Sequence, residues 1–300
     1  MITKGTLVVI GGPTASGKTH AAATLGEHFG TEVISADSRQ FYGAMQIGTA
    51  RPLEEELLGV KHHFLGHLLV EDTWSAGTFA RAAEPVLQRV LAERGIVILV
   101  GGSGLYIDAL IKGLDPLPAG DPVLRERLQE RFKKDGLGPL LAELQQLDPQ
   151  SHTRIDRHNP HRVIRALEIC LATGRPYSEQ RTTPRDRDDI RIVRIAIDLP
   201  RSDLYARIEA RVDQMITDGL VDEARSLLPY RHHNALHTVG YTELFAHFDG
   251  KLDLISAVAL IKQHTRNYAK RQMTWLRRDA SWTFIPPEPK SVIAHVQSQV

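Results

Sequence analysis

The chain has 300 residues, of which 42% are hydrophobic and 24% are charged, a composition that supports a buried core and excludes a disordered chain. Its single cysteine, Cys170, excludes an internal disulfide framework and a cysteine-based zinc finger. The net charge is +1, and the sequence has neither a long apolar run nor a signal-peptide pattern, so we expect a cytoplasmic protein with no membrane segment.

The N-terminal third predicts alternating strands and helices. Short apolar strands are expected over 6–10, 33–36 and 96–100, with one helix beginning near residue 17 and another over 76–92. Strands that are apolar on both faces and separated by helices are typical of a parallel sheet that helices cover on both sides. The predicted fold class is therefore α/β, with a parallel sheet flanked by helices.

A helical block follows. Asp121-Pro122 and Asn159-Pro160 are typical helix starts, with proline at the first helical position, and another short helix fits 139–147. Residues 151–181 hold six arginines against three acids, the local charge that a confined nucleic-acid footprint or a solvated helix face would show. We expect a small helical domain, residues 121–188, inserted into the α/β core.

The sheet is predicted to resume after this block. A β pattern returns over 192–199, Ser202 is expected to cap a helix that Gly219 ends, and a long helix is expected over 254–277. The predicted domains are an α/β core of residues 1–120 and 189–285, the insertion of residues 121–188, and a peripheral tail of residues 286–300.

One octapeptide matches the phosphate-binding loop pattern G-x-x-x-x-G-K-[ST]: Gly12-Pro13-Thr14-Ala15-Ser16-Gly17-Lys18-Thr19. Its glycines let the backbone curl so that successive N–H groups face phosphate oxygens, and the following helix adds the positive end of its dipole. Lys18 supplies a charge, and the Thr19 hydroxyl is suited to bind Mg²⁺. The motif predicts a di- or triphosphate site in a P-loop NTPase-like fold.

The sequence lacks the second acid of an ordinary nucleoside triphosphatase. In that class an aspartate at the end of a later apolar strand holds Mg²⁺, whereas the strand over 96–100 ends in Gly101-Gly102. The acid that does follow a strand is Asp37. At the carboxyl end of a parallel strand it faces the crevice where ligands bind, so we interpret it as a metal ligand or a general base.

Two further sets of cations have two interpretations each. Arg207 and Arg211 are four residues apart on one predicted helix face, so they reach a common diphosphate or pair with neighbouring acids on the surface. Lys262, Arg266 and Lys270 form a stripe along the last long helix, which is either a solvated face or a contact to RNA phosphates.

Further segments identify a family. In chain order they are Ser35-Ala36-Asp37-Ser38-Arg39-Gln40-Phe41-Tyr42, Ile47-Gly48-Thr49-Ala50-Arg51-Pro52, His62-His63, Val100-Gly101-Gly102-Ser103-Gly104-Leu105-Tyr106, Asn159 to Glu168, Gly240-Tyr241, and Lys270 to Arg277. Together with the phosphate loop, this series resembles the bacterial tRNA dimethylallyltransferases, also called tRNA isopentenyltransferases. The matches run from residue 12 to residue 277, nearly the whole chain.

The resemblance implies transfer of a dimethylallyl group from dimethylallyl diphosphate to N6 of the adenosine 3′-adjacent to the anticodon in tRNA, with release of diphosphate. Its implied partners are the donor and the tRNA anticodon stem-loop. We expect Mg²⁺ as cofactor and a monomer. A phosphate loop without the usual hydrolysis apparatus suits a diphosphate leaving group.

By resemblance, Asp37 is the base that accepts the N6 proton, and Lys18 and Thr19 complete the catalytic set. The phosphate loop, Arg207 and Arg211 are expected to bind the donor. Besides Asp37, the positions expected to bind tRNA are Ser38, Arg39, Gln40, Ser103, Arg125, His161, Arg162, Val163, Ile164, Arg165, His237, Thr238, Val239, Gly240, Tyr241, Thr242, Lys270, Arg271, Gln272, Met273, Thr274, Trp275, Leu276 and Arg277.

The chain departs from the family pattern at three positions. Gln46 stands where Asp is usual, His161 stands where Gln is usual, and Thr238 replaces a small or apolar residue. Alternative functions are an isopentenyltransferase for free adenine nucleotides, a P-loop kinase, and a nucleotide-dependent RNA-binding switch without enzymatic activity. The arginine-rich insertion favours tRNA, because a free nucleotide needs no such platform.

Overall fold

The computed structural model describes residues 5–115, 117–118, 120–182 and 186–300. The remaining positions of the predicted domains, residues 1–4, 116, 119 and 183–185, lie outside the described residues. The chain divides into two compact units. The first consists of Met1–Ile111 with Arg187–Val300, and the second is Lys112–Asp186. In the part of the chain that is described, no helix is both long and apolar enough to cross a membrane.

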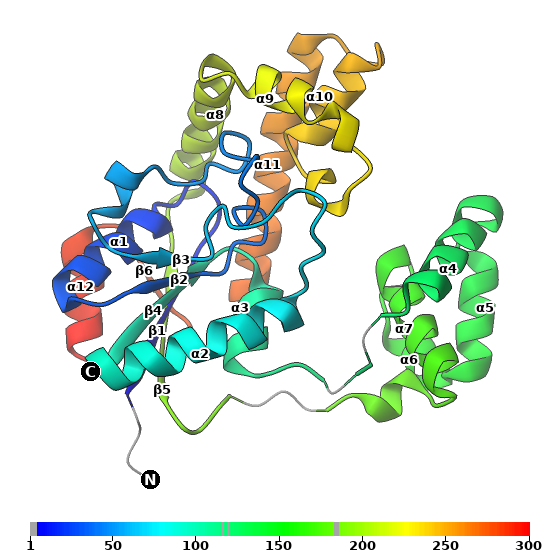
Figure 1. Ribbon diagram of the computed structural model, residues 1–300, viewed down its shortest axis with the longest axis horizontal. Helices are drawn as coiled ribbons and strands as arrows, with labels where there is room; N and C mark the ends of the chain where they lie inside the picture. Colours follow the sequence, from blue (N-terminus) through cyan, green and yellow to red (C-terminus); the bar gives the residue numbers. More distant parts are fainter. Residues whose placement is uncertain (1–4, 116, 119, 183–185) are drawn as a thin grey trace. The chain divides into compact units, whose positions relative to one another are not determined.

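The first unit is built on a six-stranded sheet in which every pair of neighbouring strands is parallel (Figure 1). In spatial order the strands are β3 (His62–His63), β2 (Val33–Ser35), β4 (Ile96–Gly101), β1 (Thr6–Gly11), β5 (Arg191–Ile197) and β6 (Thr283–Ile285). The described helices of this unit are α1 (Lys18–Phe29), α2 (Ala76–Arg94), α3 (Gly104–Ile111), α8 (Arg201–Thr217), α9 (Leu220–Ser226), α10 (Tyr241–Phe248), α11 (Leu254–Leu276) and α12 (Pro289–Gln297). Short 3₁₀ turns lie at Glu54–Leu57, Leu228–Tyr230 and Asn234–Leu236.

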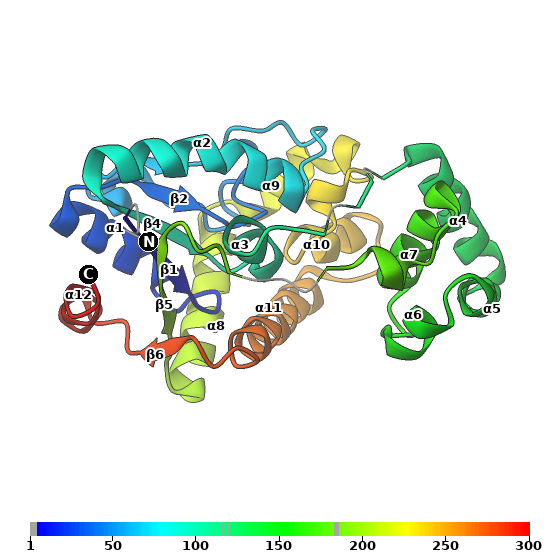
Figure 2. The ribbon, with the colours of Figure 1, turned by 90° about the horizontal axis from the view of Figure 1, so that it is seen from below.

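The central strands are buried on both faces. Successive residues of β1 alternate between two hydrophobic clusters, because strand side chains point to opposite sides of a sheet. Leu7 and Val9 pack in the cluster that holds side chains of α2 and α3, whereas Val8 and Ile10 pack in the cluster of α1 and α12. Figure 2 labels these helices around the sheet. This confirms the predicted parallel sheet covered by helices on both sides.

The structure corrects three details of the sequence prediction. The tail is not peripheral: α12 buries Val292 and Val296 in the same cluster as α1. Strands β3 and β6 were not predicted: they are as short as or shorter than β2 but, unlike β2, they are not buried, so no apolar run marks them, and their pairing with β2 and β5 identifies them as strands. Helix α8 begins at Arg201 after Pro200, so Ser202 is not its cap.

The second unit is a small helical domain with its own core. Its helices are α4 (Pro122–Asp135), α5 (Gly138–Leu147), α6 (Pro149–Arg154) and α7 (Pro160–Thr173), followed by a 3₁₀ turn over Tyr177–Gln180. The predicted starts are confirmed: the Asp121 side chain accepts hydrogen bonds from the first turn of α4, and Asn159 caps α7. Apolar side chains from α4, α5 and α7 form the core. The unit begins at 112 instead of the predicted 121, so residues 112–120 belong to it and not to the core, and it ends at 186 where 188 was predicted.

Candidate active site

The phosphate loop joins β1 to α1 in the strand–loop–helix context that the motif requires. Gly17 has a φ of 92° immediately before the helix, and Ala15 has a φ of 64°. A side chain at Gly12 would lie within 2.7 Å of the Ser16 hydroxyl. The loop therefore delivers the first turn of α1, whose N–H groups have no partners within the helix, to the position where phosphate binds in such motifs.

A glutamine from a distant helix fixes this loop. Gln272 accepts a hydrogen bond from the Thr14 N–H at 2.9 Å and donates one to the Gly102 carbonyl at 3.0 Å. These bonds brace the phosphate loop, and because the side chain is buried, the expected contact of the Gln272 side chain with tRNA is corrected. No local signal in the sequence could reveal this brace, because 258 residues separate its two ends.

The negative charge near Lys18 does not offset the desolvation of its ammonium group. Burial lowers the pKa of its ammonium group, Asp37 partly opposes that shift, and Arg211 adds to it. A cation whose environment is dominated by desolvation gains from any anion brought close to it. The local electrostatics therefore fit a site for a phosphate group.

His62 presents a buried acceptor next to the loop. Its Nδ1 lies 2.9 Å from the Val60 carbonyl, which can only accept, so Nδ1 carries the proton and Nε2 has a lone pair. Burial lowers the pKa of this imidazole. Nε2 has no partner among the described residues, and His62 lines a small cavity together with Lys18 and Thr19.

The residues around the loop fit Mg²⁺ only if the donor supplies part of its coordination. The described residues contain no group of three His, Cys, Asp or Glu side chains that could hold a metal ion. Mg²⁺ usually keeps several waters and takes few protein ligands beside substrate phosphates. Thr19 lines the small cavity, and the buried Ser16 hydroxyl has no partner among the described residues. This set suits Mg²⁺ bound together with a diphosphate.

Asp37 lies two residues beyond the end of β2. Its carboxylate accepts a hydrogen bond from the Arg39 N–H at 3.2 Å, and its carbonyl accepts one from the Gln40 N–H at 3.1 Å. These bonds close a turn that fixes the carboxylate at the edge of the sheet. Asp37 lines both the small cavity that holds Lys18 and a larger cavity of about 510 Å³. Asp37 therefore borders both cavities.

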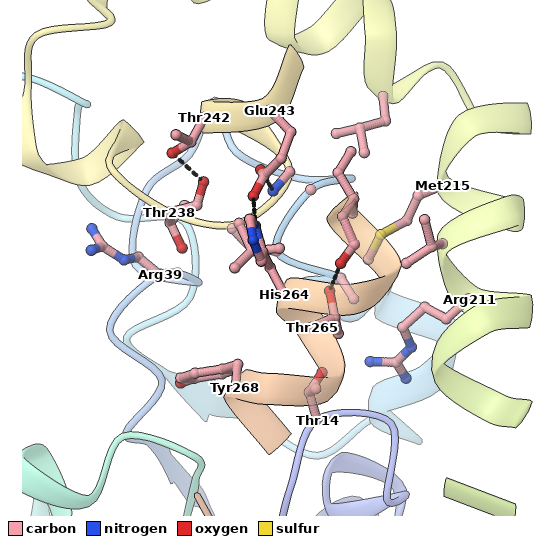
Figure 3. Close-up of a pocket in the computed structure, with 18 of the residues that line it drawn as sticks. Thr14, Arg39, Arg211, Met215, Thr238, Thr242, Glu243, His264, Thr265 and Tyr268 are labelled. Atoms are coloured by element: carbon pink, nitrogen blue, oxygen red, sulfur yellow. Dashed lines mark hydrogen bonds and ion pairs between the residues drawn. The ribbon is translucent and has the colours of Figure 1, made fainter. Parts of the chain in front are cut away.

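The larger cavity lies among α8, α10, α11 and loops of the first unit (Figure 3). Arg211 and Tyr268 lie at the end of the cavity where Thr14 of the phosphate loop is found. Desolvation lowers the pKa of the Arg211 guanidinium and raises the pKa of the Tyr268 hydroxyl. The His264 imidazole is hydrogen-bonded through Nδ1 to the buried carboxylate of Glu243. Apolar walls are formed by Val212, Met215, Leu220, Val239 and Ile261.

The residues after Asp37 organise the cavity rim through backbone contacts. The Arg39 guanidinium donates to the carbonyls of Asn234 at 2.8 Å and Ala235 at 3.0 Å. The Ser38 N–H donates to the Ser103 hydroxyl at 3.1 Å. Both Ser38 and Arg39 line the cavity, so the structure brings these two predicted tRNA-binding residues to the side of Asp37.

The predicted tRNA segment over 237–242 divides into lining and core residues. Tyr241 is fully buried, and its hydroxyl donates to Glu223 at 2.7 Å, so the expected contact of its side chain with RNA is corrected. The segment members that line the larger cavity are His237, Thr238, Val239, Gly240 and Thr242.

Two cations of the α11 stripe are paired. Lys262 lies 2.6 Å from Asp213 and Arg266 lies 2.8 Å from Glu209, and both acids belong to α8. These pairs hold α11 to α8, which weakens the interpretation of the whole stripe as an RNA contact. Among the described residues, Lys270 forms no ion pair, and it is exposed.

The segment over 270–277 also has two faces. Met273 and Leu276 are buried in the core, so their side chains are corrected from tRNA contacts to packing residues. Trp275 is half-buried and donates to Asp108 at 3.2 Å. The exposed members are Lys270, Arg271, Thr274 and Arg277.

Arg211, but not Arg207, belongs to the larger cavity. Arg207 is exposed on the same helix and is absent from the described residues that line that cavity. The expectation that both arginines reach one diphosphate is therefore supported by position for Arg211 alone.

Within the second unit, several predicted tRNA residues serve the fold. Val163 and Ile164 are buried in its core, so their side chains are corrected from RNA contacts to packing residues. Arg125 and Arg165 both pair with the buried Glu168, at 2.6 and 2.8 Å. The exposed candidates on α7 are His161 and Arg162.

The fold and the site define a P-loop α/β protein in which one aspartate borders both the phosphate loop and a second cavity. Residues 40–279 match the family model described as IPP transferase. The chain belongs to this family, as the sequence resemblance predicts.

Curated relatives match over almost the full chain. The chain is 43% identical over 296 residues to the tRNA dimethylallyltransferase of Christiangramia forsetii. The aligned region covers 98% of each chain. It is 43% identical over 288 residues to tRNA dimethylallyltransferase 1 of Bacteroides thetaiotaomicron, which covers 96% of this chain and 94% of that one.

Solved structures share the fold. The full-length tRNA isopentenylpyrophosphate transferase of Bacillus halodurans is 35% identical, with a TM-score of 0.70 over 98% of this chain and 94% of that one. A eukaryotic dimethylallyltransferase, described as acting on tRNA, is 23% identical, with a TM-score of 0.80 over 94% of this chain and 74% of that one. The likeness confirms the predicted P-loop α/β fold.

Proposed function

We propose that this chain transfers the dimethylallyl group of dimethylallyl diphosphate to N6 of the adenosine 3′-adjacent to the anticodon of tRNA. The observation that carries the proposal is the place of Asp37, which borders both the small cavity at Lys18 and Thr19 and the larger cavity. A carboxylate at that junction can reach a nucleobase in the larger cavity while a diphosphate ester occupies the phosphate loop. Family membership and the relatives named tRNA dimethylallyltransferase support the same assignment.

The chemistry follows from this placement. The N6 lone pair attacks C1 of the donor, the bond from C1 to the bridging oxygen breaks, and its electron pair leaves with diphosphate. Asp37 accepts the N6 proton as the C–N bond forms, because an exocyclic amine is a weak nucleophile. General-base assistance of this kind contributes roughly 10²–10⁴-fold in rate.

The leaving group needs stabilisation as its charge grows. The N–H groups of the phosphate loop and the ammonium of Lys18, a residue that lines the small cavity, would supply it, and Arg211 lines the larger cavity together with Thr14 of the loop. Mg²⁺, held by Thr19 together with the diphosphate, would neutralise further negative charge when bound.

The acceptor base would enter the larger cavity, whose volume of about 510 Å³ lies in the range of small-molecule sites. A base of an anticodon loop must leave its stack to reach Asp37, at a cost of a few kcal/mol. The contacts to the anticodon stem-loop, the monomeric state and the cytoplasmic location stay predictions.

Incubation with Mg²⁺, tRNA and dimethylallyl diphosphate, without ATP, tests the proposal. The expected result is release of one diphosphate for each prenyl group found on RNA. A strict requirement for ATP, or formation of ADP from ATP and an acceptor, would support a kinase instead. RNA affinity that depends on nucleotide, without a covalent product, would support a binding switch.

A further inference from the structure

One wall of the larger cavity is a short loop whose conformation needs outside support. We call residues 46–51 the wall loop. Gly48, Thr49 and Ala50 line the larger cavity. Ala50 has a φ of 47°, in the left-handed region that non-glycine residues seldom adopt. Such a backbone persists only where the surroundings hold it in place.

The two ends of the wall loop are tied to each other. The Gln46 amide donates to the Arg51 carbonyl at 2.7 Å, and its oxygen accepts from the Arg51 guanidinium. Arg51 also donates to the carbonyls of Tyr42 and Gly43, both at 3.1 Å. Gln46 thus donates and accepts at once, which an ionised aspartate at this position could not do.

The first half of the wall loop, residues 46–48, is held from α9 by one carboxylate. Glu223 accepts hydrogen bonds from three consecutive N–H groups, those of Gln46 at 2.9 Å, Ile47 at 2.7 Å and Gly48 at 2.9 Å. Its fourth donor is the Tyr241 hydroxyl at 2.7 Å. Each carboxylate oxygen accepts two of these bonds, and bonds to an ionised acceptor are about twice as strong as neutral ones.

Tyr241 adds a surface against which the loop rests. A side chain at Gly48 would lie within 2.6 Å of the Tyr241 ring, so only glycine allows this approach. The tyrosine is fully buried, and burial raises the pKa of its hydroxyl, with the Glu223 carboxylate acting in the same direction. The hydroxyl therefore keeps its proton and remains a donor to Glu223.

The wall loop is connected to the proposed base. The Gln40 side chain donates to the carbonyls of Thr49 at 3.1 Å and Ala50 at 3.0 Å. The N–H of the same residue donates to the Asp37 carbonyl at 3.1 Å. Hydrogen bonds and the backbone of the wall loop thus connect Glu223 through Gln40 to the turn that carries Asp37.

We propose that Glu223 is a positioning residue for the acceptor adenosine: it sets the wall loop that shapes the larger cavity beside Asp37. The inference rests on the proposed function for the identity of the acceptor. It assigns Glu223 no contact with the donor, because the phosphate loop is braced separately by Gln272.

Glu223→Gln is the sharpest test. A side-chain amide must turn its NH₂ group either toward the N–H groups of Gln46 and Ile47 or toward that of Gly48, so at least one bond becomes a clash of donors. We expect KM for tRNA to rise about tenfold or more, with KM for the prenyl donor changed by less than about twofold. Hydrogen exchange should accelerate at the amides of residues 46–48.

Two variants calibrate this result. Tyr241→Phe removes one of the four donors and should raise KM for tRNA less than Glu223→Gln does. Asp222→Asn changes the charge of the neighbouring exposed residue and should match the wild type in both KM values and in exchange. The exchange measurement needs no substrate, so it also reports on a variant that is inactive.

Three results would overturn the inference. These are an unchanged KM for tRNA in Glu223→Gln, unchanged exchange at residues 46–48, or an equal rise in both KM values with faster exchange throughout the first unit. An equal rise in both KM values with faster exchange throughout the first unit would indicate a general loss of structure. If the wild type prenylates no RNA, the proposed function fails by itself, and exchange still tests whether Glu223 holds the wall loop.

Discussion

The phosphate loop and helix α7 differ in how their charged side chains are paired. Lys18 is a cation whose burial outweighs its attraction to Asp37, and the Ser16 hydroxyl beside it is buried without a partner among the described residues. On α7, Arg165 shares the buried carboxylate of Glu168 with Arg125, both through Oε2, while Oε1 has no partner among the described residues. The difference therefore lies in the cations: a cation without a close anion marks a place for a ligand, whereas cations paired with a buried carboxylate hold a fold together.

The largest expected effect is on the rate of the chemical step, with little change in substrate binding. Asp37→Ala should lower the single-turnover rate by about 10²-fold or more, because no other carboxylate lines both cavities among the described residues. Affinity for tRNA, measured by filter binding, should stay near that of the wild type. Near-normal single-turnover chemistry at saturating substrates would place the base elsewhere.

Removing the ammonium group of Lys18 should change KM for one substrate only. Lys18→Ala loses a charge-assisted bond to phosphate worth about 1.5–3 kcal/mol, so KM for the prenyl donor should rise roughly 10- to 100-fold. KM for tRNA should change little. Steady-state kinetics with each substrate varied in turn would measure both, and an equal rise in the two values would contradict a site specific for the donor.

The ion pairs of Glu168 with Arg125 and Arg165 should contribute to stability and not to catalysis. Glu168→Gln leaves two arginines, whose side chains are 45% and 31% exposed, without their shared anion. Because water partly solvates both cations, we expect a loss of about 1–3 kcal/mol in the unfolding free energy of the second unit. Urea unfolding would show it. Unchanged stability would mean that these pairs contribute nothing measurable to the fold.

The smallest expected effect compares two cations of α11. Lys270→Ala should lower the slope of log affinity for tRNA against log salt by roughly 0.7–0.9 if it touches one phosphate. Arg266→Ala should leave that slope unchanged, because Arg266 already pairs with Glu209. Binding measured at several salt concentrations decides. Equal slopes for both variants would show that ion pairing does not separate RNA contacts from structural cations.

The sequence was informative for most features whose determinant is local, with the expected cap at Ser202 as an exception. The phosphate loop and the caps at Asp121 and Asn159 each depend on a few adjacent residues, so their patterns predict them. The same holds for the buried central strands, whose apolar runs are continuous.

Long-range partners limited the prediction of the site. Gln272 belongs to a segment that resembles an RNA-binding motif, and only the folded chain shows that it holds Thr14. Glu223 lies 175 residues from Gly48, and no local pattern marks it as the anchor of the wall loop. The acids that pair with Lys262 and Arg266 belong to α8, so the sequence shows an acid-free stripe where the structure shows ion pairs.

The central claim is that one aspartate joins a diphosphate site to a site for a tRNA base. Its most direct test is mass spectrometry of nuclease fragments from tRNA incubated with Mg²⁺ and dimethylallyl diphosphate, with AMP present as a competing acceptor. We predict a dimethylallyl group on the adenosine 3′-adjacent to the anticodon and none on AMP. Prenylated AMP with unmodified tRNA, or no prenylated product at all, would contradict the account.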